Sequence, residues 1–82
     1  MQVRRRIHVA GIVQGVGFRP YVYRLATERR LAGQIANTSS GVVIEVDCAA
    51  ELVDDFLSSL PVQAPPLALV TDIQVVEIDR TG

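Results

Sequence analysis

The sequence has only one cysteine and one histidine, and this scarcity limits the chemistry that the chain can perform. A lone cysteine, Cys48, has no partner for an internal disulfide, which is typical of a protein in a reducing compartment. Together with the one histidine, His8, it cannot supply a tetrahedral zinc site built from these two residue types. We therefore expect no metal site and no cofactor in this chain.

Long apolar runs are also missing. The longest uninterrupted apolar stretch is far shorter than the roughly 20 residues of a membrane-spanning helix. The basic first segment, MQVRRRIHVAGIV, is interrupted by His8 and Gly11 and lacks the small-residue cleavage pattern of a signal peptide. A net charge of −1 predicts no general attraction to nucleic acid or to an anionic membrane. We expect a cytoplasmic protein with neither of these partners.

The composition that remains is typical of one small globular unit. The chain has 82 residues, of which 49% are hydrophobic and 21% are charged. A chain of this length holds one modest core. We therefore expect a single domain over residues 1–82.

The first half of the chain changes from one periodicity to another. Residues 3–13 alternate between apolar and polar, which predicts a half-buried strand. Residues 20–31 repeat apolar side chains at steps of three and four, which predicts an amphipathic helix with Pro20 in its first turn. Arg29 and Arg30 favour the negative end of that helix, and Gly33 is expected to terminate it.

The second half predicts a hairpin, a helix and a strand. Residues 33–48 contain two short strands around the polar turn NTSSG at 37–41. Apolar side chains at helical spacing predict a helix over residues 49–61, ended by Pro61. After a stiff proline-rich connection, residues 67–78 predict the last strand.

The order of these elements predicts the fold class. In the last strand the alternation shifts at Val75 and Val76, which favours a bulge there, and residues 79–82 leave no length for a further strand. The order strand, helix, strand, strand, helix, strand is the split βαβ arrangement of ferredoxin-like folds. We therefore expect an α+β sandwich, in which two helices cover one face of an antiparallel sheet.

The segment VQGVGFRPY, residues 13–21, joins the first strand to the first helix. Its glycines tolerate the conformations that let successive backbone N–H groups point into one concavity. The helix dipole and an arginine fork add positive charge suited to phosphate or carboxylate. The residues expected to bind the anion are Gly15, Val16, Gly17, Phe18 and Arg19.

A tight turn without a ligand is the other interpretation of the same glycines. The segment is not a Walker loop, because the spacing and the lysine of that pattern are absent. Pro20 stands where a dinucleotide-binding motif needs its third glycine. The loop alone therefore leaves open whether a ligand binds.

Two motifs together, VQGVGFR and GQIANTSSGVVIEV, resemble the signature pair of the acylphosphatase family: a phosphate loop with its arginine, and a strand that ends in asparagine. The longer form VQGVGFRPYVYRLA resembles the N-terminal acylphosphatase-like domains of HypF carbamoyltransferases in NiFe hydrogenase maturation more than stand-alone acylphosphatases. The resemblance covers essentially the whole chain. It implies an acylphosphatase-like domain excised from the N-terminus of a larger multidomain protein.

The resemblance also implies catalytic roles for two residues. Arg19 corresponds to the phosphate-binding arginine, and Asn37 to the residue that holds the attacking water. An amide at this position can hold a neutral water without the repulsion that a carboxylate would add beside a dianion. The sequence shows no carboxylate pair, Cys/His dyad or metal cluster, so the expected substrate is already reactive, as acyl phosphates and carbamoyl phosphate are.

In the scheme that the resemblance implies, the acylphosphatase-like domain cleaves carbamoyl phosphate as the first step of carbamoyl transfer. Carbamate is then activated with ATP in another region, and the carbamoyl group passes to a cysteine of a HypE-like partner protein. Only the first step belongs to this chain. The alternatives are a stand-alone acylphosphatase and a non-catalytic phosphate-binding or structural module of the same fold.

An RNA-recognition module shares the predicted element order. Its sheet stacks bases on exposed aromatic side chains, and the predicted strands here contain no Phe, Tyr or Trp. The basic run at residues 4–6 does not form one patch, since alternation places Arg5 opposite Arg4 and Arg6. Both observations argue against nucleic-acid binding.

Three further side chains have simpler structural interpretations. Tyr21 and Tyr23 lie two positions apart on the predicted helix, so one is expected to pack while the other meets solvent or a partner. His8 is expected to be an ordinary residue on the polar face of the sheet. Cys48 shares the parity of the apolar residues before it, which predicts a buried, inert thiol.

Overall fold

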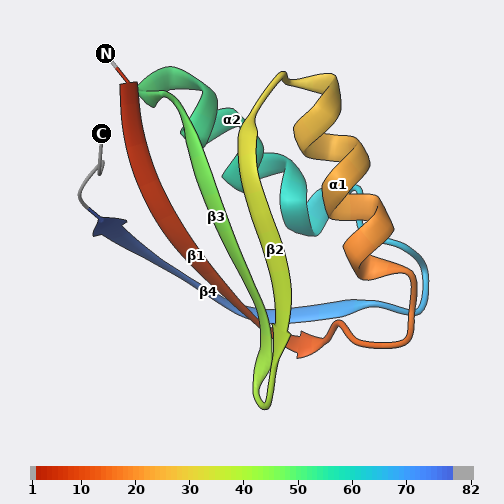
Figure 1. The fold of residues 1–82 in the computed structure, drawn as a ribbon. Coiled ribbons are helices and arrows are strands. Elements are labelled where there is room, and N and C mark those ends of the chain that lie inside the picture. Colours follow the sequence, from red (N-terminus) through yellow and green to blue (C-terminus); the bar gives the residue numbers. More distant parts are fainter. Residues whose placement is uncertain (1, 79–82) are drawn as a thin grey trace.

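A computed structural model describes residues 2–78 and has the predicted element order (Figure 1). The elements are β1 (Gln2–Ile12), α1 (Phe18–Glu28), β2 (Ala32–Thr38), β3 (Gly41–Ala49), α2 (Ala50–Val62) and β4 (Leu69–Ile78). The four strands form one antiparallel sheet in the order β2-β3-β1-β4. The ferredoxin-like sandwich is therefore confirmed. The expectation about residues 79–82 lies outside the described residues.

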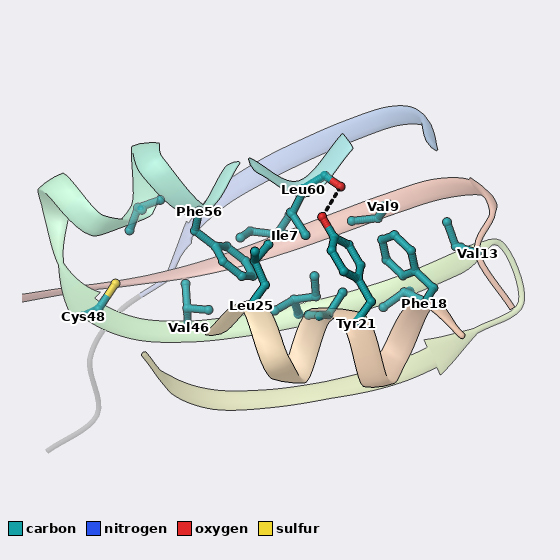
Figure 2. Close-up of a cluster of buried hydrophobic side chains, with 14 residues drawn as sticks. Ile7, Val9, Val13, Phe18, Tyr21, Leu25, Val46, Cys48, Phe56 and Leu60 are labelled. Carbon is teal, nitrogen blue, oxygen red and sulfur yellow. Dashed lines mark hydrogen bonds between the residues drawn. The ribbon is translucent and has the colours of Figure 1, made fainter. Parts of the chain in front are cut away.

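The core lies between one face of the sheet and the two helices (Figure 2). One parity of each central strand points inward, and each helix presents its apolar face to it. The buried side chains are Ile7 and Val9 of β1; Phe18, Tyr21, Val22 and Leu25 of α1; Val42, Ile44, Val46 and Cys48 of β3; Val53, Phe56 and Leu60 of α2; and Val13 of the loop. Phe18 is 0% exposed, so its burial stabilises the fold by about 1.5–3 kcal/mol. This contact also fixes the first turn of α1 beside the glycine loop.

The opposite face of the sheet carries the charged parity of its central strands. On this face, cross-strand ion pairs join Arg4 to Asp47 at 3.7 Å and Arg6 to Glu45 at 3.0 Å. Arg5 pairs with Glu77 at 3.2 Å on the other parity. Arg4, Arg6 and the exposed His8 share this outer parity, whereas Arg5 has the parity of buried Ile7. The prediction that Arg5 points to the opposite side from Arg4 and Arg6 is therefore confirmed. Within residues 2–78, no helix is long and apolar enough to cross a membrane.

Helix α1 begins two residues earlier than predicted. Gly17 adopts the left-handed conformation with φ 79°, and its carbonyl accepts a 3.2 Å hydrogen bond from the Tyr21 N–H. The helix therefore starts at Phe18, and Pro20 lies within its first turn, where a missing N–H costs nothing.

The end of α1 also differs from the prediction. Gly33 lies inside β2, so it does not terminate the helix; Arg30 takes the left-handed conformation instead, with φ 57°. The N–H groups of Arg30 and Leu31 donate to the carbonyls of Thr27 and Ala26 at 3.0 and 2.9 Å. This is the hydrogen-bond pattern of a Schellman cap, with arginine at the position that usually holds glycine.

Replacing Arg30 by glycine is expected to stabilise the protein by about 0.5–1 kcal/mol. A left-handed φ costs a residue with a side chain roughly 1–2 kcal/mol. Glycine avoids this strain, but part of the stabilisation is lost because glycine has greater conformational freedom in the unfolded chain. Arg30 is exposed and forms no ion pair within residues 2–78, so little contact is lost. Urea denaturation measures the change. Arg30→Ala keeps the strained backbone and should not stabilise.

Helix α2 continues to Val62, one residue past its predicted end at Pro61. The N–H of Gln63 donates to the Ser59 carbonyl at 3.1 Å and closes the last turn. Proline therefore lies in the final turn of the helix rather than stopping it.

The irregularity of β4 does not lie at Val75 and Val76, so that prediction was wrong. The register between β1 and β4 shifts between Ala10 and Gly11, which leaves Thr71 of β4 without a partner. The two valines are each 44% exposed because β4 is an edge strand. Because an edge strand is open to solvent, two adjacent apolar residues can follow one another there without a bulge.

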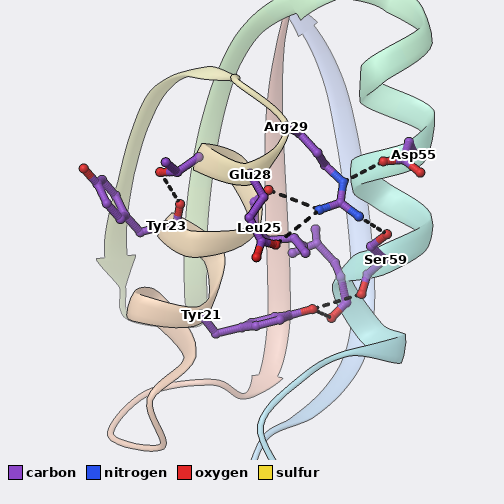
Figure 3. A network of polar contacts seen from close by, with 9 residues as sticks. Tyr21, Tyr23, Leu25, Glu28, Arg29, Asp55 and Ser59 are labelled. Carbon is purple, nitrogen blue, oxygen red and sulfur yellow. Dashed lines mark hydrogen bonds and ion pairs between the residues drawn. The ribbon is translucent and has the colours of Figure 1, made fainter.

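Arg29 connects the two helices (Figure 3). It follows the last residue of α1 rather than lying in the last turn, because the helix ends earlier than predicted. Its Nε donates to an Asp55 carboxylate oxygen at 2.6 Å, and its Nη2 donates to the Ser59 hydroxyl at 2.9 Å, both in α2. The Tyr21 hydroxyl of α1 also donates to the Leu60 carbonyl of α2, at 2.7 Å. Burial raises the pKa of this phenol.

The two tyrosines of α1 separate as predicted. Tyr21 is 3% exposed and faces α2, whereas Tyr23 is 69% exposed and projects on the side of β2 (Figure 3). One tyrosine therefore holds the helices together, and the other is available to solvent or a ligand.

Candidate functional site

The candidate site begins with the loop between β1 and α1. Gly15 and Gly17 have φ values of 72° and 79°, and Val16 between them keeps a negative φ. Such alternation of backbone handedness turns successive N–H groups toward one side, which is the geometry of an anion-binding concavity. A Cβ at either glycine would meet no atom within 4 Å. The backbone conformation, rather than crowding, therefore favours glycine here.

The backbone N–H groups of residues 15–19 have no hydrogen-bond acceptor in the part of the chain that the structure describes. The residue before the helix, Gly17, offers no side-chain cap, and the first turn of α1 contains no acidic residue. Most helices satisfy these N–H groups with a Ser, Thr, Asp or Asn side chain. The loop thus presents several free donors at the positive end of a helix dipole.

Arg19 is the second residue of α1, and its side chain is exposed. Four other arginines, at positions 4, 5, 6 and 29, form ion pairs with carboxylates. Arg19 forms none within residues 2–78. Arg24 and Arg30 form none there either, but Arg19 alone lies in the first turn of α1, where its charge adds to that of the free amides.

Asn37 is the second-to-last residue of β2 and lies within the strand rather than in the turn. Its cross-strand partner is Val42, which is buried against the helices. Directly opposed residues of an antiparallel pair point to the same face, so the Asn37 side chain projects on the helix-covered side of the sheet. The end of β2 and the start of α1 lie at the same end of the molecule (Figure 1). The convergence of Asn37 and Arg19 on one anion stays a prediction.

Gln14 physically links the two parts of the site, a role that the sequence analysis missed. Its side-chain Nε2 donates to the Thr38 carbonyl at 2.6 Å and to the Gly41 carbonyl at 2.9 Å. Thr38 directly follows Asn37 and Gly41 begins β3, so these bonds tie the glycine loop to both ends of the β2–β3 turn. The only signal in the sequence was an amide side chain between Val13 and the first glycine of the loop.

The other side chains considered in the sequence have structural roles. Cys48 is buried, and desolvation, followed by the neighbouring Asp47 carboxylate, raises the pKa of its thiol, which keeps it in the unreactive form. Residues 2–78 contain no group of three or more His, Cys, Asp or Glu side chains that could hold a metal ion. The Thr38 hydroxyl accepts a 3.3 Å hydrogen bond from the Ser40 N–H, so it acts in the turn.

Comparison with known proteins finds similarity along most of the chain. A family model described as Acylphosphatase matches residues 5–82. The chain is 46% identical over 79 residues to the carbamoyltransferase HypF of Rhizobium leguminosarum bv. viciae, covering 96% of this chain and 10% of that protein. It is 40% identical over 74 residues to an acylphosphatase of Alcanivorax borkumensis, covering 89% of this chain and 79% of that protein.

The fold of the chain is also similar to that of solved structures. A full-length HypF in its phosphate- and nucleotide-bound form matches with a TM-score of 0.92 at 38% identity, covering 98% of this chain and 11% of that chain. The chain spans about a tenth of the length of the HypF relatives that it matches.

Proposed function

The chain belongs to the acylphosphatase family, and from this premise we propose that it hydrolyses acyl phosphates, with carbamoyl phosphate as its substrate in NiFe hydrogenase maturation. The observation that carries the proposal is the row of unsatisfied N–H groups at residues 15–19, beside an arginine without a carboxylate partner. A phosphoryl group supplies the negative charge and the several acceptor oxygens that such a row of donors requires.

In this mechanism, the loop amides and Arg19 bind the phosphoryl oxygens. The Arg19 guanidinium offers two parallel donors to two of those oxygens, and the amides contact the others. Charge on the phosphoryl group is then stabilised by donors that the fold has already oriented. Positioning and electrostatics supply most of the rate enhancement.

Asn37 would hold the attacking water on the helix-covered side of β2. The water oxygen attacks phosphorus, the bond from phosphorus to the acyl oxygen breaks, and the carboxylate leaves. One water proton passes to a phosphoryl oxygen, so the products are a carboxylate and inorganic phosphate; from carbamoyl phosphate the carboxylate is carbamate. An activated anhydride needs no separate general base for this step.

The relatives support two settings for this chemistry. The HypF relatives are carbamoyltransferases, which supports hydrolysis of carbamoyl phosphate as the first step within a larger enzyme with a HypE-like partner. The Alcanivorax relative, of which the chain covers 79%, supports action as an acylphosphatase by itself. Both settings use the same loop, arginine and asparagine.

Phosphate release from carbamoyl phosphate and acetyl phosphate, measured side by side on the 82-residue protein, tests the proposal. We expect turnover of both substrates above the uncatalysed rate. A calorimetric titration with inorganic phosphate runs in parallel. Phosphate binding without turnover of either substrate would support the non-catalytic module and contradict the proposed hydrolysis.

Gln14→Ala is expected to lower kcat/KM for acetyl phosphate by about 10- to 100-fold. The substitution removes two hydrogen bonds from the loop, one to the end of β2 and one to the start of β3. A displacement of about 1 Å between catalytic groups costs up to this much. Gln14→Glu gives a readout that a purely structural role would not: the protonated carboxyl can donate one of the lost bonds, so activity should recover as the pH falls toward 5. Gln74→Ala, on the outer face of β4, is the matched control. An effect of Gln14→Ala no larger than that of Gln74→Ala would contradict the positioning role.

A further inference from the structure

An open hollow of about 440 Å³ borders the glycine loop. Gly17 and Pro20 form one side of it, and residues 63–66, in the connection between α2 and β4, form the other. Figure 1 shows this connection passing beside the start of α1. A Cβ at Gly17 would meet no atom within 4 Å, and glycine has none, so no side chain at this residue closes the border. The hollow is therefore continuous with the candidate anion-binding loop.

The hollow and β2 lie on opposite sides of α1. Tyr21 lines the hollow, and its hydroxyl donates to the Leu60 carbonyl, so this face of α1 is turned toward α2. Tyr23 projects instead on the side of β2, the strand that carries Asn37 (Figure 3). Arg19 precedes Tyr23 by four positions and therefore shares its face of the helix. The start of α1 thus has Arg19 and β2 on one side and the hollow on the other.

This arrangement matches the geometry of phosphoryl transfer. The attacking oxygen and the leaving oxygen lie roughly in line, on opposite sides of phosphorus. In the proposed mechanism, Asn37 holds the attacking water on the β2 side and the loop holds the phosphoryl group. The leaving acyl oxygen then points away from β2, across Gly17, and its substituent enters the hollow.

Gln63 is the free polar side chain in this hollow. Its backbone N–H closes α2 through the 3.1 Å bond to the Ser59 carbonyl, but within residues 2–78 its exposed side-chain amide has no hydrogen-bond partner. Pro65 and Pro66 follow closely and restrict the backbone. The helix end and the prolines therefore hold the backbone of Gln63 on either side, while its amide stays available.

The two other polar side chains of the hollow are less suited to a short substituent. The Tyr21 hydroxyl is already bound to a carbonyl of α2. Arg24 lies seven residues beyond Gly17, which places it about 10 Å further along the axis of α1, at the far end of the hollow. Gln63 is thus the side chain left to contact a group held next to the loop.

We propose that Gln63 binds the carbamoyl group of carbamoyl phosphate in this hollow and so favours that substrate over acetyl phosphate. The two carboxamides are complementary: Nε2 of Gln63 donates to the carbamoyl carbonyl, and its Oε1 accepts from the carbamoyl amino group. Acetyl phosphate has a methyl group in place of the amino group, so it forms only the first bond. The inference rests on the proposed function and names the residue that selects its substrate.

The test measures kcat/KM for carbamoyl phosphate and for acetyl phosphate in the unmodified protein, Gln63→Ala and Gln63→Leu. Dividing the ratio of a variant by that of the unmodified protein cancels the different intrinsic reactivities of the two anhydrides. We expect the ratio of carbamoyl to acetyl kcat/KM to fall by about 2- to 10-fold in both variants, the value of one neutral hydrogen bond. Gln63→Leu keeps most of the side-chain volume, so the same fall there assigns the loss to hydrogen bonding.

Phosphate binding separates this role from a structural one. Inorganic phosphate has no acyl substituent, so its Kd should be the same in Gln63→Ala and in the unmodified protein. Gln74→Ala, which removes an exposed amide on the outer face of β4, is the matched control and should leave the substrate ratio unchanged. Circular dichroism verifies that all three variants fold.

Two results would overturn the assignment while leaving the proposed hydrolysis intact. One is an unchanged substrate ratio in the folded Gln63 variants. The other is an equal loss of activity toward both substrates together with weaker phosphate binding, which indicates a general effect on the loop. Failure of the unmodified protein to hydrolyse either substrate would instead overturn the proposed function, and this inference with it.

Discussion

Arg19→Ala is expected to lower kcat/KM for acetyl phosphate by at least about 10²- to 10³-fold. This is the effect of losing one preoriented donor to a developing negative charge, and Arg19 offers a charge and a donor pair together. Because Arg19 is exposed and forms no ion pair within residues 2–78, the fold should be unaffected. Phosphate-release kinetics measure the loss, and thermal unfolding verifies that stability is unchanged.

Two companion variants show what Arg19 contributes. Arg24→Ala removes an exposed arginine from the same helix and should change kcat/KM by less than about threefold, since an exposed charge that does not contact the phosphoryl group is screened by salt. Arg19→Lys restores the charge without the planar fork, so it should recover only part of the activity. Similar losses in Arg19→Ala and Arg24→Ala would mean that general electrostatic attraction, rather than a defined contact, explains the effect.

Asn37→Ala is the second large expected loss, also about 10²-fold or more in kcat. The substitution removes the amide that would hold the attacking water, while the loop that binds the phosphoryl group stays intact. The two variants should therefore differ in phosphate binding: Arg19→Ala weakens the Kd for inorganic phosphate, and Asn37→Ala leaves it within about twofold. Calorimetry with phosphate measures this difference directly.

Asn37→Asp tests the chemical reason for an amide at this position. A carboxylate has nearly the same size but repels the dianionic substrate, so this variant should be as inactive as Asn37→Ala and should bind phosphate more weakly. Gln74→Ala, which removes an exposed amide from the outer face of β4, should retain full activity. Normal turnover by Asn37→Asp would contradict the role assigned to the asparagine.

The element order could be predicted from the sequence because its signals are local. Alternation in β1 and β3 and helical spacing in α1 and α2 recur within short windows, and each window specifies which side chains face the core. The separation of Tyr21 from Tyr23 followed from the same periodicity. The element ends were predicted less well, because caps depend on single backbone conformations such as that of Arg30.

The site was only partly visible in the sequence. The loop donors and Arg19 occupy consecutive positions, so the pattern of glycine, arginine and proline could predict a row of free donors. Whether an anion binds there stays a prediction. Gln14 was missed because its two acceptors lie 24 and 27 residues further along the chain. No local pattern indicates a contact across that separation.

The sequence by itself therefore determined the kinds of elements, the inward-facing parity of each and the chemical character of the loop. Only the tertiary structure decided that Asn37 lies on the helix-covered side at the loop end and that Gln14 ties the two together. The physical reason is that secondary structure follows from interactions among neighbours in the chain. A site, in contrast, is assembled by packing and strand register between segments far apart in it.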